Sequence, residues 1–336
     1  MKNLWNWITG KSLGSYIAKR LLAGLVTVFF IATATFFAMH AAPGDPLRAE
    51  KGGNKEIQDN LKARYGLDKP LFVQYGLYMK NLACGDFGES FTQKNRRVND
   101  IIADHFPVSA LLGVMAMVWA TLGGILWGAL TALSRNRWPD TVIMLMVILG
   151  ISVPGFVFAS MVQLGIVHVN EFLGWSIPIA ANTTAPADAG FFQKLGLMVP
   201  SLLIPSMMLG IGTMAFMTRL MRSSMLEVIN SDYIRTARAK GLPPLRIFFS
   251  HQLRNAVLPL ITVLGPSIAA VTTGSFVIEK IFIIPGLGKF FVEAVQQADY
   301  AVIMGTTVFY GSFLVFMVLV VDVLYGFIDP RIRVQG

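Results

Sequence analysis

Residues 108–134 read VSALLGVMAMVWATLGGILWGALTALS, and no Asp, Glu, Lys or Arg interrupts them. A second uncharged stretch runs from Leu21 to Ala42. A helix needs about 20 apolar residues in a row to cross the roughly 30 Å hydrocarbon core of a bilayer, and both stretches are long enough. Of the 336 residues, 54% are hydrophobic and only 14% are charged, whereas soluble domains average about 25% charged residues. The sequence therefore predicts an all-α polytopic membrane protein.

Six hydrophobic segments divide the chain. We expect transmembrane helices over residues 21–42, 108–133, 141–168, 196–218, 256–278 and 303–328. Because six is an even number, both termini lie on the same side of the membrane. That side then carries the terminal segments 1–20 and 329–336, a short loop over 134–140 and a long loop over 219–255, and the opposite side carries 43–107, 169–195 and 279–302.

The distribution of cations orients these segments. Lys and Arg close to the ends of spans accumulate in cytoplasmic loops. With a cytoplasmic N-terminus, the inner segments hold fifteen cations and four acids, and the outer segments hold thirteen cations and fourteen acids. We therefore predict that both termini are cytoplasmic. The inner cations directly adjoin the spans and belong to no nucleic-acid module, so membrane lipid is an expected partner and nucleic acid is not.

The first span could instead be the apolar core of a cleaved signal peptide, because Lys19 and Arg20 precede it and Ala41 and Ala42 follow it. Such cores run about 7–15 residues. The uncharged stretch here is longer, which favours a retained span.

Residues that could carry catalysis are sparse. The single cysteine, Cys84, excludes an internal disulfide framework and a cysteine-based metal cluster. The four histidines lack metal-ligand spacing, and no Walker-type GxxxxGK[ST] motif occurs. The sequence therefore predicts no catalytic residue, no metal site and no nucleotide site in this chain.

Prolines and glycines within the spans indicate where helices bend or approach one another. Pro154 lies inside the third expected span, where proline removes a backbone donor. It marks either an ordinary kink or a bend that lines a cavity. Gly124 and Gly128 form a small-xxx-small pair, which allows another helix to approach closely.

Charged residues within or beside the spans are few. Asp322 is the one acid well inside a span, and intramembrane acids are candidates for function. Because it lies near the cytoplasmic end of the sixth span, we expect it to pair with the basic loop rather than to relay protons. Glu279 and Lys280 are expected at the outer boundary of the fifth span, where a charge costs little.

The long cytoplasmic loop contains a short basic helix. Asn230-Ser-Asp232 offers a helix N-cap, residues 233–240 have a helix-forming composition, and Gly241 followed by two prolines is a stop signal. The helix lies outside the membrane and is tied at both ends to spans. One interpretation is that its cations only set the topology or contact anionic lipid.

The same loop resembles the EAA loop of the permeases of binding-protein-dependent ABC importers, in particular their peptide and nickel branch. The resemblance rests first on Tyr233-Ile-Arg-Thr-Ala-Arg-Ala-Lys-Gly-Leu242 and His251-Gln-Leu-Arg-Asn-Ala-Val-Leu-Pro259. Arg235 stands where the general loop has Glu, and Leu258-Pro259 comes later than in sugar permeases. Both departures are usual in the peptide branch.

Motifs outside the loop extend the resemblance from about residue 16 to residue 333. They are Ala42-Pro-Gly-Asp-Pro46, Tyr65-Gly-Leu-Asp-Lys-Pro-Leu71, Gly85-Asp-Phe-Gly-Glu-Ser-Phe91, Val277-Ile-Glu-Lys-Ile-Phe-Ile-Ile-Pro-Gly-Leu-Gly288 and Asp322-Val-Leu-Tyr-Gly-Phe-Ile-Asp-Pro-Arg-Ile-Arg333. Their order resembles that of the B-type permease subunit. The stretches 106–113 and 273–279 are most similar to the oligopeptide permease, with the dipeptide permease also near.

This resemblance implies a type I ABC importer permease in the bacterial cytoplasmic (inner) membrane. It implies three kinds of partner: a homologous C-type permease, two cytoplasmic ABC ATPases and an extracytoplasmic peptide-binding protein. ATP and Mg would be bound by the ATPases, with no cofactor and no catalysis on this chain. The outer segment 43–107 would either dock the binding protein or form a folded cap without a recognition role. The residues implied in coupling to the ATPases are Tyr233, Arg235, Thr236, Ala237, Arg238, Ala239, Lys240 and Gly241.

Oligopeptides are the expected cargo, and dipeptides, nickel or glutathione remain open. An ion-coupled secondary transporter would need paired charges near the bilayer midplane and repeated halves. A membrane-bound enzyme would need a cluster of nucleophile, base or metal ligands. The expected spans show neither pattern.

Overall fold

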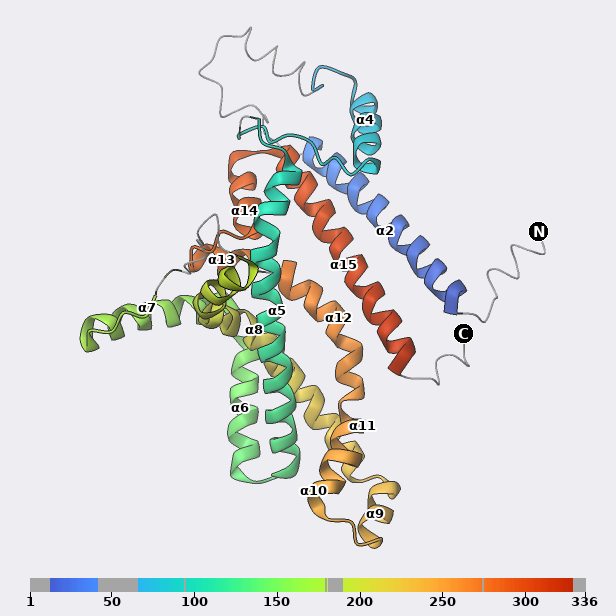
Figure 1. Cartoon of the computed structure of the whole chain (residues 1–336), viewed down its shortest axis with the longest axis vertical. Helices are drawn as coiled ribbons and strands as arrows, with labels where there is room; N and C mark the ends of the chain where they lie inside the picture. Colours follow the sequence, from blue (N-terminus) through green and yellow to red (C-terminus); the bar gives the residue numbers. More distant parts are fainter. Residues whose placement is uncertain are drawn as a thin grey trace, which may run out of the picture. The chain divides into compact units, whose positions relative to one another are not determined.

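The computed structural model describes residues 13–41, 66–93, 95–178, 180, 190–273 and 275–328. Every regular element in these ranges is a helix, apart from one isolated bridge between Glu89 and Arg97 (Figure 1). The chain forms two compact units. We describe each unit by itself.

The first unit comprises residues 1–109, 285–319 and 326–336. Its helices are α2 (Leu13–Ala41), α4 (Leu71–Ala83), the first turns of α5 (Val98–Leu133), α14 (Leu287–Gln297) and most of α15 (Tyr300–Ile328). Buried residues of α5, α14 and α15 form its main core, among them Ile101, Leu287 and Val302. A smaller aromatic cluster joins α2, α4 and α15 around Phe36 and Tyr300.

A buried carboxylate fastens an outer loop to the start of α15. Asp299 accepts hydrogen bonds from the Ser90 hydroxyl, from the backbone N–H groups of Phe91 and Thr92, and from the N–H of Val302. The last of these contacts satisfies a free donor in the first turn of α15. The same side chain therefore caps a span and fixes the loop that precedes α5.

The second unit comprises residues 110–284 and 320–325. It contains the rest of α5, then α6 (Trp138–Ser152), α7 (Gly155–Leu173), α8 (Phe191–Ile229), α9 (Asp232–Ala239), α10 (Pro244–Ile247), a π-helix (Phe248–Leu253), α11 (Arg254–Ala256), α12 (Leu258–Thr273) and α13 (Phe276–Ile281). The long helix α8 contacts α6, α7, α11 and α12. Three of its methionines, Met217, Met221 and Met225, are buried in the core of the unit.

Glycines of α5 face this methionine row. A Cβ atom added to Gly124 would collide with Cβ of Met217, and one added to Gly128 would lie 2.5 Å from Cβ of Met221 and 2.7 Å from the Thr218 carbonyl oxygen. Such distances cannot be relieved by moving a flexible side chain alone, since backbone atoms are involved. The structure thus places α8 against the small-residue face of α5.

Five described helices are long and apolar enough to cross a membrane: Ala18–Ala41, Val98–Leu133, Gly155–Leu173, Phe192–Ile229 and Tyr300–Val321. A sixth crossing results if Pro244–Ala256 and Leu258–Ile268, which meet at 46°, form one broken span. The predicted all-α polytopic class is therefore confirmed.

The expected third span, 141–168, differs from the structure because it consists of two helices. Helix α6 ends at Ser152, Val153 has an extended backbone (φ −93°, ψ 125°), and α7 begins after Pro154. Pro154 cannot donate to the carbonyl of Gly150, so the helical ladder stops at this point. Figure 1 shows α7 turning away from the direction of α6.

Glu279 also departs from expectation. We expected a position at the outer boundary of the fifth span, where a charge costs little, but the Glu279 side chain is fully buried in α13 and accepts a hydrogen bond from the Ser275 hydroxyl. The short helix α13 packs against α7 and α8. These two helices are distant from α13 in the sequence, and their contacts with it bury the carboxylate.

Candidate functional site

The loop predicted to be cytoplasmic and to couple to ATPases is helical along most of its length. Helix α8 continues without a break beyond the expected end of the fourth span, to Ile229. Helix α9 begins at Asp232, close to the expected start. Ser231 occupies the N-cap position with an extended backbone, but its hydroxyl donates to the Val228 carbonyl at 2.6 Å and caps no N–H of α9.

Glycine 241 ends α9 in a left-handed conformation, with φ at +73°. The N–H of Gly241 bonds to the Arg238 carbonyl at 2.9 Å, and the N–H of Leu242 bonds to the Ala237 carbonyl at 3.4 Å. This pair of bonds is the Schellman arrangement, which satisfies the last carbonyls of a helix. No atom lies within 4 Å of a Cβ placed on Gly241. Backbone conformation, rather than close approach of a neighbour, therefore requires glycine here.

The inner face of α9 is apolar. Ile234 and Ala237, three residues apart on one helix face, are buried against Ile247 of α10. Val228 and Leu242 pack around them. These contacts hold the short helix against the ends of α8 and α10.

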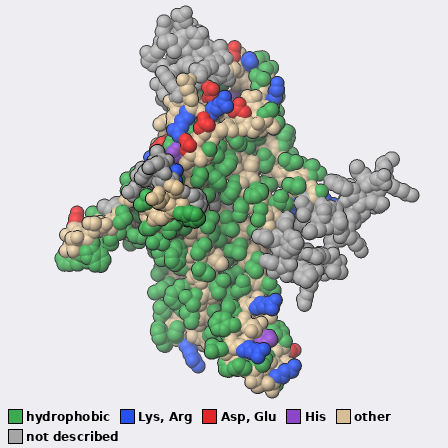
Figure 2. All heavy atoms as spheres, in the orientation of Figure 1, with side chains coloured by type: hydrophobic (Ala, Val, Ile, Leu, Met, Phe, Trp, Pro, Cys, Tyr) green, Lys and Arg blue, Asp and Glu red, His purple; other side chains and the backbone are tan. Residues whose placement is uncertain are grey.

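The outer face of α9 is exposed and basic. We call it, together with two apolar neighbours, the docking surface: Tyr233, Arg235, Thr236, Arg238, Ala239, Lys240, Leu245 and Phe249. Leu245 is 74% exposed and Phe249 60% exposed. Figure 2 shows Lys and Arg side chains gathered at the end of the second unit that carries α9. Exposed large apolar side chains rimmed by charge are typical of a protein interface.

Most cations of the docking surface are available to a partner. Arg235 makes only an exposed contact of 3.5 Å with Asp232, in the preceding turn. Arg238 and Lys240 make no ion pair within the described part of the chain. An exposed pair such as Arg235–Asp232 contributes about 0–1 kcal/mol, so it would yield readily to an acidic partner.

The hydroxyl of Tyr233 links α9 to the next part of the loop. It accepts a hydrogen bond of 3.2 Å from Nδ2 of Asn255 in α11, which also donates to the His251 carbonyl. His251 lies in the π-helix, an irregular element that often marks functional positions. The sequence offered no signal for this contact, because the two residues are 22 positions apart.

A second contact that the sequence did not reveal ties the base of α8 to α6. Nε and Nη2 of Arg222 donate to the two carboxylate oxygens of Asp140 at 2.9 and 2.8 Å. The Asp140 side chain is buried, and it also accepts from the N–H of Asn136 in the turn between α5 and α6. This two-point ion pair holds the start of the coupling segment against the neighbouring hairpin.

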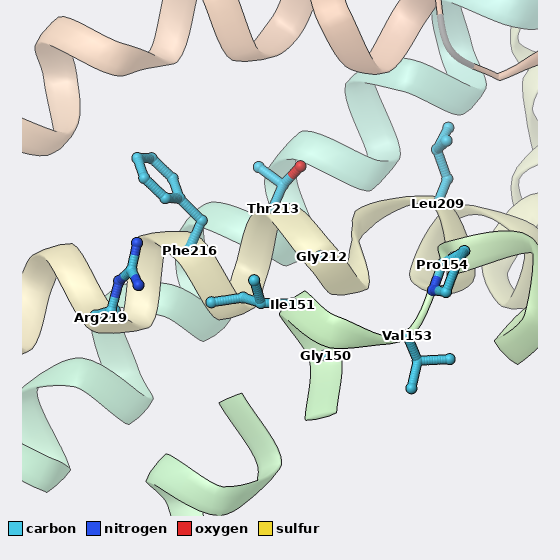
Figure 3. Close-up of a pocket in the computed structure, with 10 residues that line it drawn as sticks. Gly150, Ile151, Val153, Pro154, Leu209, Gly212, Thr213, Phe216 and Arg219 are labelled. Atoms are coloured by element: carbon cyan, nitrogen blue, oxygen red, sulfur yellow. The ribbon is translucent and has the colours of Figure 1, made fainter. Parts of the chain in front are cut away.

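A cavity of about 370 Å³ lies in the second unit where α6 breaks into α7. Pro154 lies at one end of it and Arg219 of α8 at the other, with Gly150, Thr213 and Phe216 between them (Figure 3). Pro154 ends a helix and also lines this cavity, and a role of the bend in transport stays a prediction. The lining carries one charged group, the guanidinium of Arg219.

Two further predictions lie partly or wholly outside the described residues. Asp322 belongs to α15, but its side chain is outside the described part, so its structural role stays a prediction. Much of the outer segment, residues 43–65, is likewise outside it. Within the described residues, no group of three or more His, Cys, Asp or Glu side chains could hold a metal ion.

Comparison with known proteins identifies the family. The profile described as "binding-protein-dependent transport system inner membrane component" matches residues 124–334, and the profile of its N-terminal part matches residues 13–113. The chain belongs to this family. It is thus a multi-pass inner-membrane component of a transport system and not a catalytic subunit, as the sequence predicted.

Named relatives cover almost the whole chain. The chain is 45% identical to the dipeptide transport system permease protein DppB of Bacillus subtilis (strain 168) over 96% of its own length and 99% of the relative. It is 42% identical to the oligopeptide transport system permease protein OppB of Haemophilus influenzae, over 95% and 99%, and 37% identical to OppB of Salmonella typhimurium, also over 95% and 99%. Identity does not separate the dipeptide from the oligopeptide permeases.

Proposed function

We propose that this chain is the B-type transmembrane subunit of an ATP-driven peptide importer and forms half of the translocation pathway. Family membership and the names of its relatives support peptide transport. Oligopeptides are the cargo that the sequence motifs favour, and dipeptides are the alternative that the 45% identical relative favours. Nickel and glutathione rank below both.

The docking surface is the part of the chain that we assign to coupling. Its inner face is fixed by Ile234 and Ala237 of α9, while Arg238 and Lys240 at the end of α9 and Leu245 of α10 are exposed in the described part of the chain. A rigid helix end of this kind can lie in a groove of an ATPase. Movement of the ATPase would pass through α9 directly into α8, because Val228 of α8 packs against the α9 core.

The partners follow from this assignment. Two cytoplasmic ATPases would bind the docking surface of this chain and the equivalent surface of a homologous C-type permease. An extracytoplasmic binding protein would deliver the peptide. ATP and Mg would be held by the ATPases and by no residue of this chain.

Reversal of one charge tests the coupling role. Arg238→Glu should leave the permease inserted but lower the amount of co-purified ATPase about tenfold, which corresponds to a loss of about 1.4 kcal/mol of contact energy. Peptide uptake should fall with it. The matched control is Arg137→Glu, at an exposed arginine before α6 that lies outside the docking surface. Wild-type uptake and ATPase content in the Arg238 variant would contradict the assignment.

A further inference from the structure

Helix α4, in the outer segment of the first unit, packs along the last turns of the first span. The Tyr75 hydroxyl lies 2.8 Å from the hydroxyl of Thr33 in α2. The rings of Tyr75 and Tyr78 both lie 5.4 Å from that of Phe36, centroid to centroid. Burial in this cluster raises the pKa of Tyr78 to about 12. One face of α4 is therefore fixed to α2 by aromatic packing.

The opposite face of α4 has no cover in the described part of the chain, and over its first two turns it is apolar. Phe72 is 78% exposed, and Val73 and Leu77 on the same face are also exposed. The last turn of α4 is polar, with the exposed residues Lys80 and Asn81. Three large apolar side chains on one face of a short helix would be costly to leave in water. The face needs an apolar surrounding.

The position of α4 along α2 indicates what surrounds it. Thr33 lies eight residues before Ala41, the last residue of α2, which corresponds to about 12 Å along a helix with a rise of 1.5 Å per residue. The apolar window of α2 runs from Ala18 to Ala41, so a side chain of α4 reaches well below the end of a membrane span. Farther along α2, Phe29 and Phe30 are exposed in the same way, as expected for a surface that faces acyl chains.

We propose that α4 lies in the membrane interface and that Phe72, Val73 and Leu77 insert into the leaflet at the C-terminal end of α2. In the orientation predicted from the cations, this is the outer leaflet. Its apolar face continues the lipid-facing surface of α2, and Lys80 can reach the phosphate groups of the lipids. A helix with one apolar face and a basic residue at its edge binds membrane surfaces in this way. The face is then a lipid contact and not a docking site for a soluble binding protein.

Fluorescence quenching in the assembled importer, reconstituted in nanodiscs of phosphatidylcholine and phosphatidylglycerol, tests this proposal. In a Cys84→Ser background, a bimane label is attached at Phe72→Cys or at Leu77→Cys, with Val73→Cys as the replacement if either variant fails to assemble. The control is Asn81→Cys, at the polar C-terminal end of the same helix. The quenchers are lipids with a nitroxide on the acyl chain and, separately, aqueous iodide.

We expect the nitroxide lipids to quench the label at position 72 at least about twofold more than the label at position 81, and iodide to do the reverse. The pattern should not change when binding protein is added. Equal iodide quenching at positions 72 and 81 would overturn the proposal, because the face would then be in water. Protection of position 72 from both quenchers would also overturn it, because a protein partner would then cover the face.

Discussion

At Gly241 the structure shows a conformational requirement that a substitution can isolate. The left-handed backbone at φ +73° is accessible to Asn at small cost but is strongly disfavoured for a β-branched residue. Gly241→Val should therefore distort the exit from α9 and lower retained ATPase and peptide uptake severalfold, and Gly241→Asn should stay close to wild type. Both variants place a side chain in open space, so a steric clash cannot explain a difference. Equal activity of the two variants would show that the geometry of this turn is unimportant.

Residue-scale predictions from sequence succeeded where the determinant is local. The stop signal at Gly241 and the helix start near Asp232 follow from neighbouring residues, and the structure places both where the sequence did. The ion pair between Asp140 and Arg222 joins residues 82 positions apart. No short-range pattern carries that information, so only the packing of α6 on α8 reveals it.

Among the described glycines, the closest approach between two helices is that of α5 to α8, at Gly124. Gly128→Leu should force the helices apart, because its Cβ would meet both Met221 and the Thr218 carbonyl. Overpacking of this kind costs about 1–3 kcal/mol, and the thermal midpoint of the purified complex should fall accordingly. Gly165→Leu on α7 is the control, because its Cβ meets no atom within 4 Å. If both variants melt at the same temperature, the close approach of α5 and α8 is absent in the assembled protein.

Element-scale predictions from sequence depended on hydropathy and periodicity. Long uncharged stretches predicted the spans within α2, α5 and α15, because every helix that crosses a bilayer needs a long run of apolar residues. The division of 141–168 into α6 and α7 was not predicted. Proline bends many membrane helices without ending them, and whether the helix continues depends on the neighbours that pack beside it. The burial of Glu279 was missed for the same reason.

Asp322 is predicted near the cytoplasmic end of the sixth span, either as a structural acid or as a proton relay. Replacing it should give opposite results in the two cases. A structural acid that pairs with a nearby cation leaves that cation unpaired when it is replaced, which is strongly destabilising in a buried position. Asp322→Asn should therefore lower the amount or the thermal stability of the assembled complex, while uptake per remaining complex stays unchanged. A stable complex that has lost transport would instead indicate a proton relay.

At the scale of the whole molecule, labelling of cysteines tests the membrane orientation that the cations predict. Cys84 is exposed at the end of α4 and should react in spheroplasts with a membrane-impermeant thiol reagent. In a Cys84→Ser background, Ser231→Cys, before α9, should react only after the membrane is opened. The reverse pattern would invert the topology and remove the docking surface from the cytoplasm.

The central claim is that ATP hydrolysis by partner subunits drives transport through this chain. The most direct test is uptake of labelled peptide into vesicles that contain the complete importer, with ATP enclosed and binding protein outside, in the presence and absence of a protonophore. We predict uptake that requires ATP and that is the same with and without the protonophore. Uptake that the protonophore abolishes despite ample ATP, or that proceeds without ATP, would contradict the account and favour an ion-coupled transporter.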